Sequence, residues 1–319
     1  MTMKRYTAIL MLFAAAACQH KDLCYDHPHQ SGLEVNIDWT KAPDADVETM
    51  ELFLFPAEGG KAIHHTFQNR DGGRLTVPQG TYRAICTSTG RGANRFSGPE
   101  TSFEEFAVST RTVGDAEAYY ALKSELSDNV PKADQAEAEN TIMEPDMLYS
   151  SRLGGGIEVR DRQVGKITFY PEQKTPRYTI IVKNISNLQN TKDCMASISS
   201  LSNGFFLGAD SPESGKAIQA IQMSRTDDST VQGDMTFFGH CNETLARHYI
   251  SLYFILLDGT GVYYSSDITE KFNDPAIKGR MKATIVLDLG IEIPKPITNG
   301  SGFQPTLDGW RNETIDVTM

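Results

Sequence analysis

The feature that most constrains this chain is a series of short runs rich in Val, Ile, Thr, Tyr and Phe, bounded by Gly, Pro, Asn and Asp. Such runs are typical of β-strands joined by tight turns. Residues 33–39 alternate apolar and polar side chains, as a strand with one buried face does. Little of the sequence has helical periodicity. The pattern therefore predicts an all-β protein built of β-sandwiches rather than of parallel α/β units.

Two turn signals support this prediction. Pro-Gln-Gly at 78–80 lies between two strand-like runs, and glycine there supplies the backbone freedom that a turn needs. Asp258-Gly259 lies between the apolar runs 249–257 and 261–267. An Asp-Gly pair between two such runs is typical of a β-hairpin.

A change of composition divides the strand-like runs into two groups. Residues 124–145 are dominated by Ala, Glu, Asp and Asn and lack strand alternation. A long loop inside one domain is the alternative, but structureless loops of this length are uncommon in compact folds. We therefore expect two consecutive β-sandwich domains, over 33–124 and 150–319, joined by a linker at 125–149.

The N-terminus predicts export and lipid attachment. Lys4 and Arg5 precede an apolar run at 6–17, and Cys18 follows directly. This order describes a signal peptide over residues 1–17, and the apolar run is too short to span a membrane. A bacterial lipobox usually has Leu where this chain has Ala15. We expect acyl chains on Cys18 and a lipid-proximal linker over 18–32; an ordinary signal peptide with an incidental cysteine is the alternative.

Charge argues against nucleic acid as a partner. The full chain has a formal net charge of −11, and removal of the signal peptide takes away two basic residues and no acidic one. Affinity for nucleic acid depends on basic groups that displace counterions from phosphates. The same negative charge argues against adhesion to anionic lipid. No second apolar run reaches 18 residues, so the acyl anchor is the only membrane contact that the sequence predicts.

The remaining cysteines leave several arrangements open. Four cysteines allow three pairings. Of these we favour a disulfide between Cys194 and Cys241, which both lie in the second half, although four unpaired thiols are as well supported. Near the lipid, Cys24, His27 and His29 could bind a soft divalent metal. A linker or an export signal is the better interpretation of that segment, because it precedes every expected strand.

Sequence motifs for catalysis are incomplete. The segment 208–217 has Asp210 and Ala217 where a phosphate-binding loop requires Gly and Ser or Thr. Glu104 and Glu105 are adjacent, so on a strand they point to opposite faces. We expect no enzyme activity and no cofactor.

Three segments resemble a known family. HKDLCYDHPH at 20–29, VPQGTYRAI at 77–85 and FQPTLDGW at 303–310 are similar to segments of fimbrillin-like surface lipoproteins of Bacteroides. The resemblance implies two transthyretin-like β-sandwiches, a place in the outer membrane and membership of a surface fimbria. Lys21-Asp22 also resembles the signal that sends such lipoproteins to the cell surface.

The resemblance favours a non-catalytic anchor, accessory or structural subunit of a fimbria, which would bind its partners by strand addition. A surface lipoprotein that binds a glycan or a host ligand is the alternative. Asp228-Ser229-Thr230 resembles a Bacteroidetes O-glycan acceptor, with Ser229 as the candidate, although an unmodified turn is the better interpretation. Residues 313–319 alternate to the end of the chain, so we expect a terminal strand, either in its own domain's sheet, which we favour, or paired with another subunit.

Overall fold

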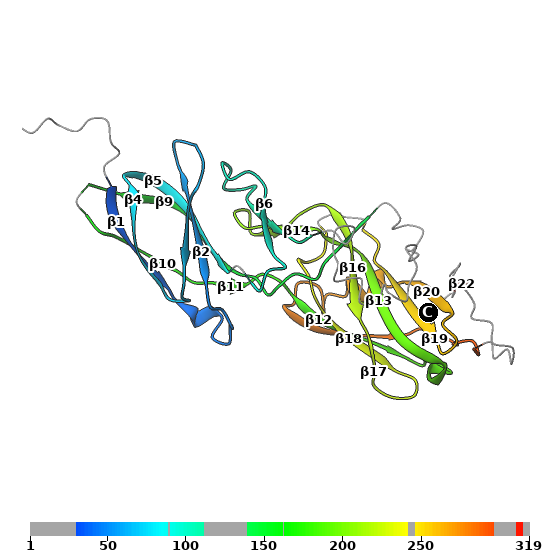
Figure 1. Ribbon diagram of the computed structural model, residues 1–319. Coiled ribbons are helices and arrows are strands. Elements are labelled where there is room, and N and C mark those ends of the chain that lie inside the picture. Colours follow the sequence, from blue (N-terminus) through cyan, green and yellow to red (C-terminus); the bar gives the residue numbers. More distant parts are fainter. Residues whose placement is uncertain are drawn as a thin grey trace, which may run out of the picture.

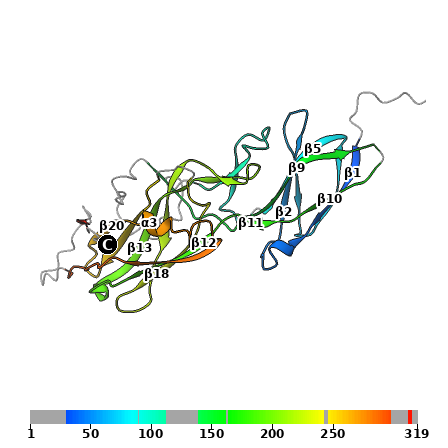
Figure 2. The ribbon, with the colours of Figure 1, turned by 180° about the vertical axis from the view of Figure 1, so that it is seen from behind.

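The computed structural model describes residues 30–88, 90–111, 139–161, 163–241 and 246–296, together with the backbone of Arg311–Thr314. The described part consists of strands in five sheets with short helical turns between them, so the predicted all-β class is confirmed. Figures 1 and 2 show two groups of sheets at the two ends of an elongated molecule.

The N-terminal sandwich packs a three-stranded sheet, β10-β1-β4, against a five-stranded sheet, β11-β9-β5-β2-β3. Its strands are β1 (Gln30–Ile37), β2 (Met50–Pro56), β3 (Ile63–Phe67), β4 (Gly72–Pro78), β5 (Gly80–Ser88), β9 (Tyr149–Val159), β10 (Gly165–Phe169) and β11 (Glu172–Gln173). Leu33, Val35 and Ile37 of β1 face the core between the sheets. The alternation of residues 33–37 therefore reflects a strand with one buried face, as predicted, whereas Trp39 lies beyond the strand in a 3-10 turn.

The C-terminal sandwich packs a four-stranded sheet, β17-β18-β12-β21, against a six-stranded sheet, β22-β20-β19-β13-β16-β8. Its strands are β8 (Asn140–Ile142), β12 (Arg177–Lys183), β13 (Thr191–Ser202), β16 (Lys216–Gln222), β17 (Ser224–Arg225), β18 (Val231–Thr236), β19 (Tyr249–Leu256), β20 (Gly261–Asp267), β21 (Lys282–Asp288) and β22 (Arg311–Thr314). Helix α3 (Thr269–Phe272) follows β20. Tyr178, Ile180 and Phe254 are fully buried between the two sheets.

One turn of the C-terminal half is visible in the sequence. β19 and β20 pair antiparallel, and the Leu256 amide donates to the Thr260 carbonyl across the turn. Gly259 has φ +84°, a left-handed conformation that favours glycine. The predicted hairpin is thus confirmed. At the outer edge of the same sheet, β22 pairs in parallel with β20, with Arg311 opposite Val262.

A fifth sheet lies between the sandwiches. It has the order β15-β14-β7-β6 and combines β6 (Arg95–Ser97) and β7 (Ala107–Ser109) with β14 (Gly204–Phe206) and β15 (Ser211–Pro212). Figure 1 shows β6 and β14 between the two larger groups of strands. We call it the interdomain sheet. The 3-10 turns η1 (Trp39–Lys41) and η5 (Leu188–Asn190) complete the described elements.

The strand pairing corrects the expected domain limits. β9 pairs with β5 and β10 pairs with β1, so residues expected in the second domain complete the N-terminal sandwich. β8, in the expected linker, pairs with β16 of the C-terminal sandwich. The chain thus passes to the C-terminal sandwich between β5 and β8, by way of the interdomain sheet, returns between β8 and β9, and passes again between β11 and β12. Sequence periodicity identifies strands but not their distant partners, which is why the limits 124 and 150 were wrong.

Candidate functional site at the junction of the sandwiches

The five-stranded sheet of the N-terminal sandwich is buried on both faces. On β2, Leu52 and Leu54 face the sandwich core, whereas Phe53 and Phe55 point to the other face. β2 is therefore buried at six consecutive positions, as expected for a strand that is covered on both sides. The interdomain sheet provides much of the second cover.

An interdomain apolar cluster fills the space between that face and the interdomain sheet. Its residues are Phe53, Phe55, Ala62, Ile85, Phe103, Phe106, Val108, Leu148, Phe205, Leu207 and Phe238. The Phe106 side chain is 1% exposed, and its ring centroid lies 4.5 Å from that of Phe53. Because the cluster draws residues from both halves of the chain, it joins the two sandwiches by continuous apolar contact.

Backbone contacts at this cluster are close. The Leu207 amide donates to the Phe106 carbonyl over 2.9 Å. A Cβ added to Gly208 would lie 1.7 Å from the Phe103 carbonyl oxygen. Only glycine therefore fits at 208 unless the backbone moves. Two segments about a hundred residues apart in sequence are locked together here.

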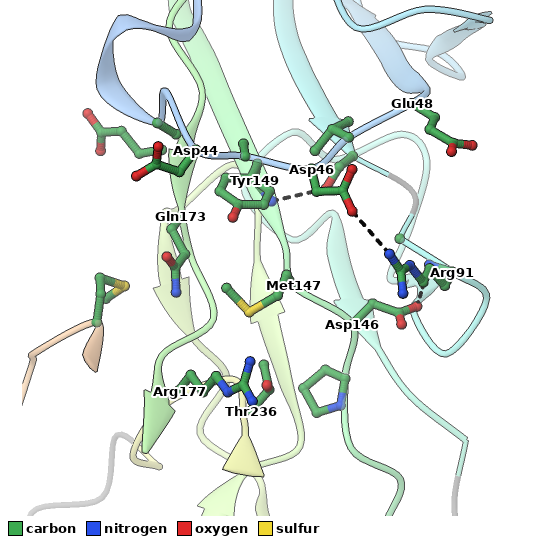
Figure 3. Close-up of a pocket in the computed structure, with 18 of the residues that line it drawn as sticks. Asp44, Asp46, Glu48, Arg91, Asp146, Met147, Tyr149, Gln173, Arg177 and Thr236 are labelled. Atoms are coloured by element: carbon green, nitrogen blue, oxygen red, sulfur yellow. Dashed lines mark hydrogen bonds and ion pairs between the residues drawn. The ribbon is translucent and has the colours of Figure 1, made fainter. Parts of the chain in front are cut away.

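A polar cleft with a volume of about 1090 Å³ opens at the same junction. Its charged lining residues are Lys41, Asp44, Asp46, Glu48, Arg91, Glu144, Asp146, Glu172, Arg177 and Lys282. Figure 3 shows Asp44 and Asp46 on one side of the cleft and Arg177 and Thr236 on the other, with Met147 between them. Six carboxylates thus lie near four cations.

Asp146 is the structural centre of one wall of the cleft. Its Oδ2 accepts hydrogen bonds from the backbone amides of Arg91 and Ala93, both over 2.8 Å, and a longer one from Asn94. Gly90 has φ +73°, and a Cβ there would lie 2.5 Å from the Asp146 Cβ. The carboxylate therefore holds the loop that leads into β6 against the segment that leads into β9.

The other carboxylates of the cleft are also engaged. The Oε1 of Glu144 accepts from the Thr236 amide over 2.7 Å and so connects the returning chain to β18. A hydrogen bond from Lys41 lowers the pKa of Glu172, and Lys174 lowers it further. Burial, then the charges of Asp44 and Asp46, raises the pKa of Tyr149. Of these contacts, the hydrogen bond from Thr236 to Glu144 is the one that reaches the C-terminal sandwich.

The described residues contain neither a candidate metal centre nor a membrane-spanning helix. No three His, Cys, Asp or Glu side chains gather there in a way that could hold a metal ion. No described helix is both long and apolar enough to cross a membrane.

Several residues singled out in the sequence lie elsewhere. Cys18, Cys24, His27 and His29 are outside the described residues, so acylation and metal binding stay predictions. Ser229 lies on an exposed loop between β17 and β18, where its hydroxyl is 3.2 Å from Asp227 Oδ1. Its glycosylation also stays a prediction.

The prediction of a disulfide between Cys194 and Cys241 is wrong: both residues are buried and are not joined to each other. Cys194 lies opposite Phe254 near the start of β13, whereas the neighbour of Cys241, His240, bridges Leu201 near its end. The strand from Cys194 to Leu201 spans roughly 23 Å at ~3.3 Å per residue. Bridged cysteines need Cα atoms within about 7 Å. Burial raises the pKa of the Cys194 thiol, which further lowers its reactivity.

The sequence interpretation missed the junction altogether. Its visible signal is the apolar run at residues 52–55 within β2, which exceeds what a sandwich with one solvated face requires. The run indicates that a second layer covers the other face of the sheet, but it does not indicate which segment supplies that layer.

Among the described residues, one sheet of the C-terminal sandwich ends in a strand with no further pairing on its outer side. β21 is the outermost strand of its sheet and pairs in parallel with β12 on one side over seven residues. The exposed Val286 lies on it. Backbone groups on the outer side of such a strand can pair with an added strand.

Comparisons with known proteins agree with this fold. A 202-residue stretch is 22% identical to a candidate fimbrium anchoring subunit, Fim4B of Bacteroides ovatus, and covers 63% of this chain and 54% of that protein. The chain thus matches about half the length of this curated relative.

Two solved structures share the architecture. A candidate adhesin from Bacteroides ovatus superimposes with a TM-score of 0.64 at 20% identity, covering 88% of this chain and 98% of that one. The fimbrial anchor protein Mfa2 from Porphyromonas gingivalis has a TM-score of 0.50 at 12% identity, covering 80% and 90%.

A family model matches residues 17–222, which include the whole N-terminal sandwich, the interdomain sheet and the first strands of the C-terminal sandwich. That span crosses the junction, as expected if the interlocked sandwiches form one unit. The chain therefore belongs to the family described as a domain of unknown function, DUF5119.

Proposed function

We propose that this protein is a surface-exposed lipoprotein of the outer membrane, held by acyl chains on Cys18, and that it acts as an accessory, anchor or structural subunit of a fimbria. Its role is structural and not catalytic. The observation that carries the proposal is the relationship to a protein named as a fimbrium anchoring subunit. The shared fold with a fimbrial anchor protein supports it.

The shape of the molecule suits this role. β1 begins at the end of the N-terminal sandwich, and η1, which follows it, lies at the junction beside the cleft. Figure 1 shows β1 and β20 at opposite ends of the molecule. A tether that precedes β1 therefore keeps the C-terminal sandwich, with the open edge of β21, away from the membrane. The interdomain cluster holds the two ends in a fixed relation.

Membrane attachment is tested by the Cys18→Ala variant in the native organism. We expect the variant to leave the membrane fraction, because a dual acyl anchor is lost with the thiol. Cys24→Ala is the matched control, since it removes a neighbouring thiol and should stay membrane-bound. Retention of Cys18→Ala in the membrane, with normal signal cleavage, would contradict the anchor.

Assembly is tested by crosslinking on intact cells, followed by identification of the captured proteins. We expect a ladder of fimbrial subunits. Capture of glycan alone, with no fimbrial subunit, would replace the assembly role by ligand binding at the surface.

A further inference from the structure

β21 differs from the other edge strands of the described part of the chain in what it lacks. It spans seven residues, KATIVLD, with no glycine or proline, and its pairing with β12 has no bulge. β4, an edge strand of equal length, begins with two glycines and ends in proline, and β8 and β17 have only three and two residues. Proteins usually protect a sheet edge by short strands, proline, bulges or inward-pointing charges. β21 has none of these devices.

The backbone of β21 presents alternate residues to β12 and to the open side. The Arg177 amide donates to the Met281 carbonyl over 2.8 Å, and the Ser186 amide donates to the Ile291 carbonyl beyond the end of the strand. In a parallel pair with this register, the odd-numbered residues of β21 direct their N–H and C=O groups to β12. The even-numbered residues direct theirs to the open side; they are Lys282, Thr284, Val286 and Asp288.

The same even-numbered residues have exposed side chains. Ile285 and Leu287 are buried in the sandwich core, whereas the side chains on either side of them in the strand are exposed. Val286 is 43% exposed, which is unusual for a large apolar side chain in a strand. The side chains of an added strand that lie opposite these residues would share their solvent-facing side of the sheet. The residues on this side therefore determine which strand fits.

The sequence of β21 is complementary to itself. If a second copy of the strand pairs antiparallel about Ile285, Lys282 lies opposite the partner's Asp288, and Thr284 lies opposite the partner's Val286. Every outward-facing residue then meets an outward-facing residue, so the backbone groups on both open sides find partners. Opposite charges and β-branched side chains that face each other across two strands stabilise their pairing.

Charge also selects this arrangement over its alternatives. A parallel pair in register would place Lys282 beside a second Lys282 and Asp288 beside a second Asp288, and like charges directly opposite each other are destabilising. An antiparallel pair shifted by two residues keeps the backbone parity but separates Lys282 from the partner's Asp288. Only the pairing about Ile285 brings these two charges together at both ends of the strand.

We propose that the open edge of β21 binds β21 of a second copy of this chain, antiparallel and in this register, so that the two β17-β18-β12-β21 sheets become one continuous sheet. The pairing itself is a property of the chain alone and does not depend on the fimbrial role.

The pairing also has a direction. Lys282 lines the cleft at the junction, so β21 runs from the junction toward the far end of the C-terminal sandwich. An antiparallel partner runs the opposite way and places its N-terminal sandwich at the opposite end of the pair (Figure 1). Copies that are tethered ahead of β1 in two facing membranes meet in this orientation. The pair therefore joins facing membranes, and this second step rests on the proposed lipid anchor.

Self-association is tested by sedimentation of the full mature chain with Cys18→Ala, so that no acyl chain can join copies. We expect a monomer–dimer equilibrium with a dissociation constant in the micromolar range, weakened by salt. A chain that stays monomeric at roughly 100 µM would overturn the proposal. So would a monomer whose β21 edge is instead needed for crosslinking to a fimbrial subunit on cells.

Thr284→Pro tests the backbone pairing. The Thr284 amide faces the open side, so proline removes one donor there and leaves the pairing with β12 intact. The dimer dissociation constant should rise at least about tenfold. Thr284→Val is the matched control, because it changes the side chain and keeps the amide. An unchanged dissociation constant in Thr284→Pro would overturn the edge-to-edge contact.

A charge exchange tests the register. Lys282→Glu leaves two carboxylates on the edge, and Asp288→Lys leaves two ammonium groups, so each variant alone should associate at least about tenfold more weakly. An equimolar mixture should form heterodimers with nearly the original affinity, since each edge then offers the charges that the other lacks. A mixture that stays monomeric, with both variants folded by circular dichroism, would overturn the register.

Vesicles test the orientation. The chain is attached through an N-terminal histidine tag to vesicles that carry a nickel-chelating lipid, and clustering is followed by light scattering. We expect the vesicles to cluster with the unsubstituted edge and to stay dispersed with Thr284→Pro. Dimers in solution without clustering of vesicles would overturn the contact between facing membranes. Release of Cys18→Ala from the membrane fraction tests the lipid anchor separately, so the two failures can be told apart.

Discussion

The junction has an apolar region and a polar region, and they hold the sandwiches together in different ways. In the interdomain apolar cluster, Phe53, Phe103 and Phe106 are each at most 3% exposed. In the polar cleft, the ion pair between Arg91 and Asp46 joins side chains that are 87% and 84% exposed. Removal of apolar surface from water stabilises in proportion to area, whereas exposed ion pairs contribute little.

The comparison teaches that the stability of the junction comes from the cluster, while the cleft fixes where loops lie. Asp146 is intermediate between the apolar cluster and the exposed ion pair in its burial and in its partners. It is half-buried, and backbone amides rather than a charged side chain are its partners. Three substitutions, ordered by the expected loss of stability, test this account.

Phe106→Ala should have the largest effect. Truncation of a buried Phe costs about 3–5 kcal/mol. Because this residue joins both sandwiches, differential scanning calorimetry should show two unfolding transitions in place of one. Phe96→Ala is the control: Phe96 stacks on Phe106 but is 38% exposed, so its loss should be much smaller. Equal effects of the two variants would mean that the cluster does not stabilise the junction.

Asp146→Ala should destabilise by about 1–3 kcal/mol, because it leaves backbone amides of the 90–94 loop without their acceptor. Hydrogen exchange at the amides of Arg91 and Ala93 should accelerate before global unfolding. Asp146→Asn retains one side-chain oxygen and should keep most of the protection. Exchange rates that stay unchanged in Asp146→Ala would show that the loop is held by other contacts.

Arg91→Ala should have the smallest effect. Its guanidinium forms an exposed ion pair with Asp46, and exposed pairs are screened by salt and compensated by side-chain freedom. We expect no measurable change in the unfolding midpoint at physiological ionic strength. A loss of stability comparable to that of Asp146→Ala would show that exposed ion pairs contribute substantially to the stability of the junction.

The sequence was informative about strands and uninformative about their distant partners. The alternation of 33–39 and the Asp-Gly turn before β20 depend on neighbouring residues, so both could be predicted. The parallel pairing of β1 with β10 joins residues more than a hundred positions apart, and no local pattern encodes it. The domain limits and the Cys194–Cys241 disulfide failed for this reason.

The candidate sites show the same limit. Arg91, Asp146 and Arg177 line the polar cleft, yet the sequence places them in three separate segments. Only the fold brings them together. The apolar run of β2 was the single local sign that a second layer covers the sheet.

The position of β1 has a mechanical consequence. If the chain is tethered ahead of Gln30 and pulled from the opposite end, tension enters β1 along its own axis. β1 is hydrogen-bonded on both sides, to β10 in parallel and to β4 antiparallel. Its ladders would therefore be loaded in shear, with many bonds sharing the force at once, and would not open one at a time as an edge strand peels. A tethered strand in this central position is suited to resist steady pulling.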